Sequence, residues 1–135
     1  WRERGALDFV LPGAVHDDGR VQRSMHASHA RRIDGRSARV AGNRVFPNGF
    51  IEVTLAVPGD TAVRLVIEGE AGRARQFTLG VDDRVEVVRF SEDGVFQCPL
   101  PTGRERVRLR LQKSGAEYPA IFGLGAVPCR ETASA

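Results

Sequence analysis

Histidine residues in a basic stretch are the first residues of this chain that could bind a metal or catalyse a reaction. His26 and His29 are three residues apart, a spacing that faces one metal ion on a helix but opposite faces on a strand. The spacing fixes no third ligand, and no C-x-x-C or H-E-x-x-H motif occurs. We therefore expect no metal site, and we interpret both histidines as surface residues. An enzyme that uses them, or His16, is the weaker alternative.

Serines and paired carboxylates offer no clearer catalytic chemistry. No G-x-S-x-G motif surrounds any serine, so acyl transfer is not expected. Three acidic pairs occur: Asp17-Asp18, Asp82-Asp83 and Glu92-Asp93. All three have the composition of turns, and a glycosidase needs two carboxylates that face one cleft. We expect no catalytic residue and no cofactor; a structural calcium at Asp17 and Asp18 stays an alternative to ordinary turn aspartates.

An arginine column lies between Arg104 and Gln112. Arg106, Arg108 and Arg110 alternate with Val107, Leu109 and Leu111, which is the period of a strand with one buried face and one wet face. We favour a solvated outer face with cross-strand carboxylate partners, which could be Glu52, Glu68 or Glu86. An interface with a neighbouring domain or subunit and a direct site for an anion are the alternatives.

Length and composition point to one globular domain. The chain has 135 residues, and we expect a single domain over 1–130 and a frayed tail or linker over 131–135. Lys113 is the one lysine among 20 basic residues. The segment from His16 to Arg44 is basic but lacks any nucleic-acid-binding motif, so we do not expect nucleic acid as a partner. No apolar run is long enough to span a membrane.

Two cysteines leave one question open. Cys98 lies on an expected strand and Cys129 follows the last one. A disulfide between them would tie the C-terminal end to a neighbouring strand and would imply an oxidising compartment. Two unrelated thiols are the equal alternative.

Short strands separated by turns must position these residues. Alternating apolar residues predict strands that end at Gly, Pro or Asp turns roughly every ten residues, as in an antiparallel β-sandwich. The expected strands are Ala6–Leu11, Val21–Ser28, Arg36–Val40, 50–57, 63–67, 77–81, 85–89, Val95–Leu100, Arg104–Gln112 and Ala120–Val127. We expect Phe9, Phe77 and Phe96 in the core. Gly123 and Gly125 indicate close packing or a bulge in the last strand.

The order of these segments resembles a known architecture. F-P-N-G-F-I-E-V-T-L, A-V-R-L-V-I-E-G, F-T-L-G-V-D, G-R-E-R-V-R-L-R-L-Q-K and I-F-G-L-G-A-V follow one another over about two thirds of the chain. This cadence is similar to the galactose-binding-like jelly roll of carbohydrate-binding modules and of domains attached to SGNH-type carbohydrate esterases. The resemblance implies an all-β jelly-roll sandwich, and a non-catalytic accessory module whose partners are a glycan and a neighbouring catalytic domain.

The resemblance transfers no ligand residues, so the binding site is predicted from residue types. Sugars need an exposed ring and polar side chains, and the loop at Pro47-Asn48-Gly49 and the one before Pro119 offer both. The predicted ligand-binding residues are Arg44, Asn48, Phe50 and Tyr118. The arginine column, as a contact between proteins or subunits, supports the alternative function of an assembly domain. The compartment stays open, with a secreted or periplasmic location favoured slightly.

Overall fold

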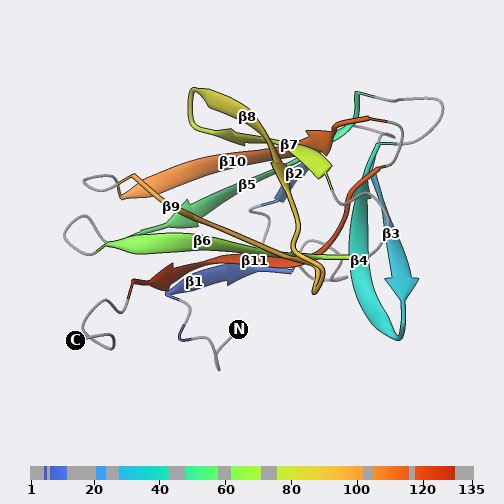
Figure 1. Cartoon of the computed structure of the whole chain (residues 1–135), viewed down its shortest axis with the longest axis horizontal. Helices are drawn as coiled ribbons and strands as arrows, with labels where there is room; N and C mark the ends of the chain where they lie inside the picture. Colours follow the sequence, from blue (N-terminus) through green and yellow to red (C-terminus); the bar gives the residue numbers. More distant parts are fainter. Residues whose placement is uncertain are drawn as a thin grey trace.

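The structure, a computed structural model, is an all-β sandwich (Figure 1). It describes residue 5 and residues 7–11, 21–23, 28–42, 48–57, 62–70, 76–101, 105–115 and 118–129, with only the backbone at 10, 21–23 and 28–31. Strands in the described residues are β1 (Asp8–Val10), β2 (Val21–Arg23), β3 (Ser28–Ile33), β4 (Arg36–Ala41), β5 (Phe50–Ala56), β6 (Val63–Gly69), β7 (Gln76–Val81), β8 (Arg84–Arg89), β9 (Val95–Pro99), β10 (Arg106–Lys113) and β11 (Ala120–Pro128).

Two antiparallel sheets form the sandwich. The six-stranded sheet has the order β3-β4-β11-β6-β9, and β1 also pairs with β11. The five-stranded sheet has the order β2-β5-β10-β7-β8. Strands distant in sequence are neighbours in both sheets, as in a jelly roll, and the predicted fold class is confirmed. The edge strands β8 and β9 lie on consecutive segments of the chain, one in each sheet.

Strict alternation builds the core. The apolar side chains of β5, β7 and β10 that face the other sheet are fully buried, except for the half-buried Val81 at the end of β7, while their neighbours in sequence are exposed or half-buried. Phe77 lies at the centre: its ring stacks on Phe90 with centroids 4.6 Å apart and meets Phe96 edge-on at 5.8 Å. A second, smaller apolar cluster lies elsewhere, and it consists of Ala38, Val40, Ala120 and Phe122 with Ile33 and Tyr118 packed against it.

Core predictions for the three phenylalanines have mixed outcomes. Phe77 is fully buried, and Phe96 is partly buried against the same core. Phe9 is half-buried and belongs to neither core cluster, so its prediction was wrong. It pairs with Gly125 of β11, on the opposite parity from the buried Leu124. The expected irregularity in β11 is confirmed, because its register with β6 shifts between Ile121 and Gly123.

Two-residue turns close two hairpins. Asp34 and Gly35, with φ of 50° and 77°, join β3 to β4, as a type I′ turn requires. Asp82 and Asp83 join β7 to β8, and the Asp82 carboxylate accepts a hydrogen bond from the Arg108 backbone amide at 3.1 Å. The first hairpin corrects the sequence analysis, which placed no strand over most of Ser28–Ile33.

Candidate functional site

The arginine column lies on the outer face of the five-stranded sheet. Arg106, Arg108 and Arg110 are exposed, while Val107, Leu109 and Leu111 are fully buried, as the alternation predicts. β5 lies beside the column and places Glu52 opposite Arg110. Arg110 donates from Nε to the Glu52 carboxylate at 3.0 Å. The predicted solvated face with a cross-strand carboxylate is therefore what Arg110 and Glu52 form.

Phe50 contacts the same arginine, Arg110, with the face of its ring. The Arg110 guanidinium lies over the Phe50 ring, 3.8 Å from its centroid, so Arg110 combines an ion pair with a cation–π contact. Phe50 pairs with Gln112 across the two strands, and Gln112 Nε2 donates to the Asn48 carbonyl at 3.4 Å. The Asn48 side chain is exposed. These four residues form what we call the β5–β10 patch: Asn48, Phe50, Arg110 and Gln112.

The other two predicted ligand residues do not join this patch. Tyr118 packs against the small apolar cluster on the six-stranded sheet, and the Lys113 ammonium lies 5.4 Å from its ring centroid. Lys113 follows Gln112 at the end of β10, so this strand end connects the patch with Tyr118. Arg44 lies outside the described residues. The structure thus unites Asn48 and Phe50, adds Arg110 and Gln112, and separates Tyr118.

A similar arginine cluster lies on the other sheet. Arg36 lies over the Phe122 ring, 4.2 Å from its centroid, and forms an ion pair with Glu68. The hydrogen bond to Glu68 raises the pKa of Arg36. Each cluster covers a partly apolar surface with a fixed guanidinium whose remaining N–H groups can bind oxygen atoms.

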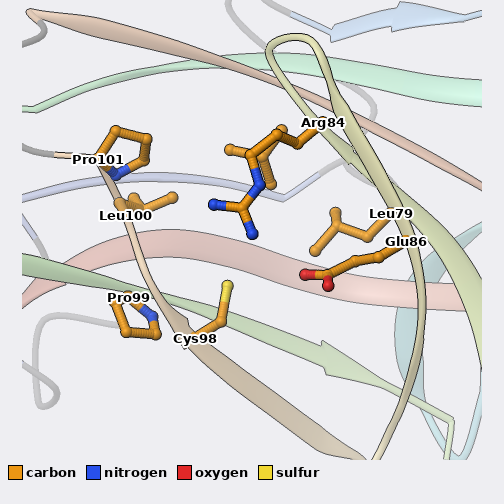
Figure 2. Close-up of a pocket in the computed structure, with 8 residues that line it drawn as sticks. Leu79, Arg84, Glu86, Cys98, Pro99, Leu100 and Pro101 are labelled. Atoms are coloured by element: carbon orange, nitrogen blue, oxygen red, sulfur yellow. The ribbon is translucent and has the colours of Figure 1, made fainter.

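A hollow of about 350 Å³ lies between the two sheets at the edge formed by β8 and β9. Arg84 and Glu86 reach into it from β8, and the Cys98 thiol points toward them from β9 (Figure 2). Its remaining lining is apolar: Leu79, Val81, Pro99, Leu100 and Pro101. Sequence analysis missed this hollow and named Glu86 only as a partner for the arginine column. Glu86 pairs with the buried Leu79, so it lies on the inward side of the sheet, opposite to the side that carries the arginine column.

Burial in this hollow raises the pKa of the Cys98 thiol, and the negative charge of Glu86 raises it further, while Arg84 lowers it. The thiol is therefore protonated at neutral pH and is a weak nucleophile.

Alkylation of Cys98 by iodoacetamide should consequently reach half its maximal rate at a higher pH than an unstructured cysteine peptide. Glu86→Gln should lower this midpoint, and Arg84→Gln should raise it, because each removes one of the opposing charges. Mass spectrometry of the fragment that contains Cys98 measures the rate. A midpoint at or below that of the peptide would contradict the structure.

Both cysteines are free thiols in the structure, so the disulfide alternative is not what the fold forms. Cys98 pairs with Leu65 on β6, and Leu65 pairs with Ala126 on β11. Cys98 is thus two strands, about 9–10 Å, from Ala126, and Cys129 is three residues farther along the chain. Since a disulfide needs Cα atoms within about 7 Å, this pair cannot close without moving the backbone.

A second, shallower hollow lies on the outer face of the six-stranded sheet. Arg64, Ser91, Asp93 and Gln97 line it together with Val66 and Val95, and its volume is about 520 Å³. The Arg64 Nε is buried and has no hydrogen-bond partner in the structure. A hydroxyl or water oxygen at this point would satisfy that donor.

The described residues form neither a cluster of metal ligands nor a membrane-spanning helix. They contain no group of three or more His, Cys, Asp and Glu side chains that could hold a metal ion. His16, His26, Asp17 and Asp18 lie outside them, and only the backbone of His29 is described, so the calcium alternative stays a prediction. No helix long and apolar enough to cross a membrane occurs in the described part of the chain.

Comparisons with known proteins place the fold. No family model and no curated protein matches the sequence. Among solved structures, a family 35 carbohydrate-binding module from Clostridium thermocellum is similar over 90% of this chain and 98% of its own, with a TM-score of 0.60 and 12% identity. An exo-β-1,3-galactanase from Phanerochaete chrysosporium is similar over 87% of this chain, with a TM-score of 0.60 and 12% identity.

A family two carbohydrate esterase from Cellvibrio japonicus shares the fold over 89% of this chain, with a TM-score of 0.52 and 9% identity. This chain spans only 28% of the galactanase and 32% of the esterase, but nearly all of the family 35 module. The chain therefore has the jelly-roll fold of carbohydrate-binding modules and esterase-attached domains, and the resemblance found in the sequence is confirmed.

Proposed function

We propose that this jelly roll is a non-catalytic carbohydrate-binding module, and that it serves as an accessory domain of a larger enzyme. The observation that carries the proposal is its similarity to 98% of the length of a family 35 carbohydrate-binding module. The galactanase and the esterase support the accessory role, because in both the similar region is about a third or less of a longer enzyme. The catalytic domain, on this proposal, lies outside these residues, and the module acts in a secreted or periplasmic compartment where polysaccharides occur.

The β5–β10 patch is the glycan-binding site we propose. Arg110 is held by Glu52 and Phe50, so its remaining N–H groups are fixed and can donate to sugar hydroxyls at little entropic cost. The amides of Asn48 and Gln112 add donors and acceptors at one end of the same strands. Because the guanidinium covers the Phe50 ring, this phenylalanine positions Arg110, while Tyr118 offers an aromatic ring at the far side of the β10 end.

Arg110→Ala should lower glycan affinity about tenfold or more, since a hydrogen bond to a charged group contributes roughly 1.5–3 kcal/mol. Arg106→Ala is the matched control: Arg106 is exposed on the same face of β10, four residues away, and should change affinity less than twofold. Titration calorimetry measures both affinities against three saccharides. These are β-1,3-galactotriose, named for the similar galactanase, and arabinogalactan and β-1,4-mannan, named for a 4-O-methyl-α-glucuronidase and a β-1,4-mannanase that also share the fold.

Two results would count against this proposal. Equal affinities for both variants would move the site away from the β5–β10 patch. Failure to bind any saccharide of a broad array, together with self-association in sedimentation that Arg108→Ala abolishes, would support the assembly alternative. The structural comparisons do not favour that alternative.

A further inference from the structure

The hollow between β8 and β9 is separate from the β5–β10 patch. It opens at the sandwich edge where the last strand of each sheet lies, and the patch is on the outer face of one sheet. Its volume of about 350 Å³ lies in the range of small-molecule sites. Three polar side chains converge on it from two strands: Arg84, Glu86 and Cys98 (Figure 2).

We propose that this hollow binds a small aromatic carboxylic acid that carries a hydroxyl group on the opposite side of its ring, as in 4-hydroxybenzoate. The ring would lie against the apolar wall, the carboxylate would pair with Arg84, and the hydroxyl would donate to Glu86. The site does not depend on glycan binding, so either proposal can fail without the other.

The apolar wall selects a ring over a more polar molecule. The apolar surface that a ligand can reach belongs to Val81, Pro99 and Pro101, while Leu79 and Leu100 belong to the core, with exposed fractions of 0% and 5%. Flat aromatic groups bury much apolar area at such walls and lose little conformational freedom. A sugar would leave most of its hydroxyls without partners here, because the lining has few polar groups.

Opposite charges on one strand set the orientation. Arg84 and Glu86 are two residues apart on β8, so both side chains project from the same face and their Cα atoms are about 6.5–7 Å apart. Neither forms an ion pair with another described residue, so each retains its capacity for a ligand. A guanidinium binds a carboxylate with two parallel hydrogen bonds, while a carboxylate accepts from a hydroxyl. A para-substituted ring separates an acceptor and a donor by a similar length.

The Cys98 thiol completes the wall without adding charge. Its raised pKa keeps it neutral at pH 7, so it neither repels a carboxylate ligand nor disturbs the apolar contacts. It also reports occupancy, because a bound molecule would shield it from alkylation. Cys129 is not among the lining residues and serves as a control thiol in the same chain.

Binding is tested with 4-hydroxybenzoate, by protein NMR shifts and by alkylation of Cys98. We expect a dissociation constant of about 0.1–1 mM, the range for so small a ligand. Benzoate lacks the hydroxyl and 4-hydroxybenzamide lacks the charge, so each should bind at least fivefold more weakly. Saturating ligand should slow alkylation of Cys98 at least fivefold and leave Cys129 unchanged.

Variants separate this site from general surface binding. Arg84→Gln should weaken binding of 4-hydroxybenzoate about tenfold and weaken binding of the uncharged 4-hydroxybenzamide much less, because only the carboxylate forms a charge-assisted pair with Arg84. Glu86→Ala, which removes the acceptor, should remove the preference for 4-hydroxybenzoate over benzoate. Arg89→Gln is the matched control, because Arg89 is exposed on the same strand with the opposite parity and does not line the hollow.

Three outcomes would overturn the proposal. The first is no NMR shift at 10 mM ligand, and the second is equal affinity of the Arg84→Gln and Arg89→Gln variants. The third is ligand protection of both thiols alike. Far-UV circular dichroism shows whether each variant is folded before it is compared. Because Arg84 and Glu86 are exposed, neither substitution should unfold the sandwich.

Discussion

Replacing Phe77 with alanine is expected to lower the free energy of unfolding by about 3–5 kcal/mol. The Phe77 side chain is fully buried where the two sheets meet, stacked on Phe90 at 4.6 Å and in edge contact with Phe96 at 5.8 Å. Truncation removes both aromatic contacts and leaves a cavity that neighbours on rigid strands cannot fill. Chemical denaturation measures the loss, and the melting temperature should fall by roughly 10–20 °C.

A smaller apolar substitution provides the control for Phe77→Ala. Phe77→Leu keeps most of the volume but loses the stacking, so it should cost about half as much or less. Gln76→Ala changes an exposed residue beside it in β7 and should cost within about 0.5 kcal/mol. A loss below about 1 kcal/mol for Phe77→Ala would mean that the two sheets do not pack around this ring.

The sequence predicts a strand of this fold well where one face of the strand is buried and the other is exposed to solvent. β5 and β10 alternate strictly, so their position and their buried sides follow from the residues alone. β3 has the sequence S-H-A-R-R-I, with no such alternation, and it forms a strand because the Asp34-Gly35 turn folds it against β4. Its structure comes from tertiary pairing, which a local pattern does not report.

The candidate sites also contain parts that the sequence predicts and parts that depend on strand pairing. Asn48 and Phe50 are close in sequence, and a loop between expected strands predicts their proximity. Arg110 joins them because β10 pairs with β5, a register that no local pattern contains. The hollow between β8 and β9 is harder to predict from the sequence than the β5–β10 patch. On β8, Val85 and Val87 point outward and are 70% and 55% exposed, while Glu86 lies on the inward side. Hydrophobicity alone would turn this edge strand the other way.

Gly69→Ala is the second substitution with a large expected effect, a loss of about 1–3 kcal/mol in the free energy of unfolding. A Cβ at this position would lie 2.5 Å from Cζ of the Phe90 ring and 2.9 Å from the Ala120 carbonyl oxygen. That carbonyl accepts a hydrogen bond from the Glu70 amide at 3.0 Å, next to the irregular register of β11, so it cannot withdraw freely. Gly80→Ala is the matched control, because its nearest neighbour would be 3.6 Å away, and it should change stability by about 0.5 kcal/mol or less.

A double-mutant cycle identifies which neighbour causes the Gly69→Ala penalty. Phe90→Leu removes the ring atoms nearest to the new methyl group, so Gly69→Ala should cost less in that background than in the native chain. The penalty should not vanish, because the Ala120 carbonyl remains in place. If the cost is the same in both backgrounds, the backbone contact alone excludes a side chain at Gly69. If it disappears, β6 and β11 can separate slightly at this point, and Phe90 alone makes glycine necessary here.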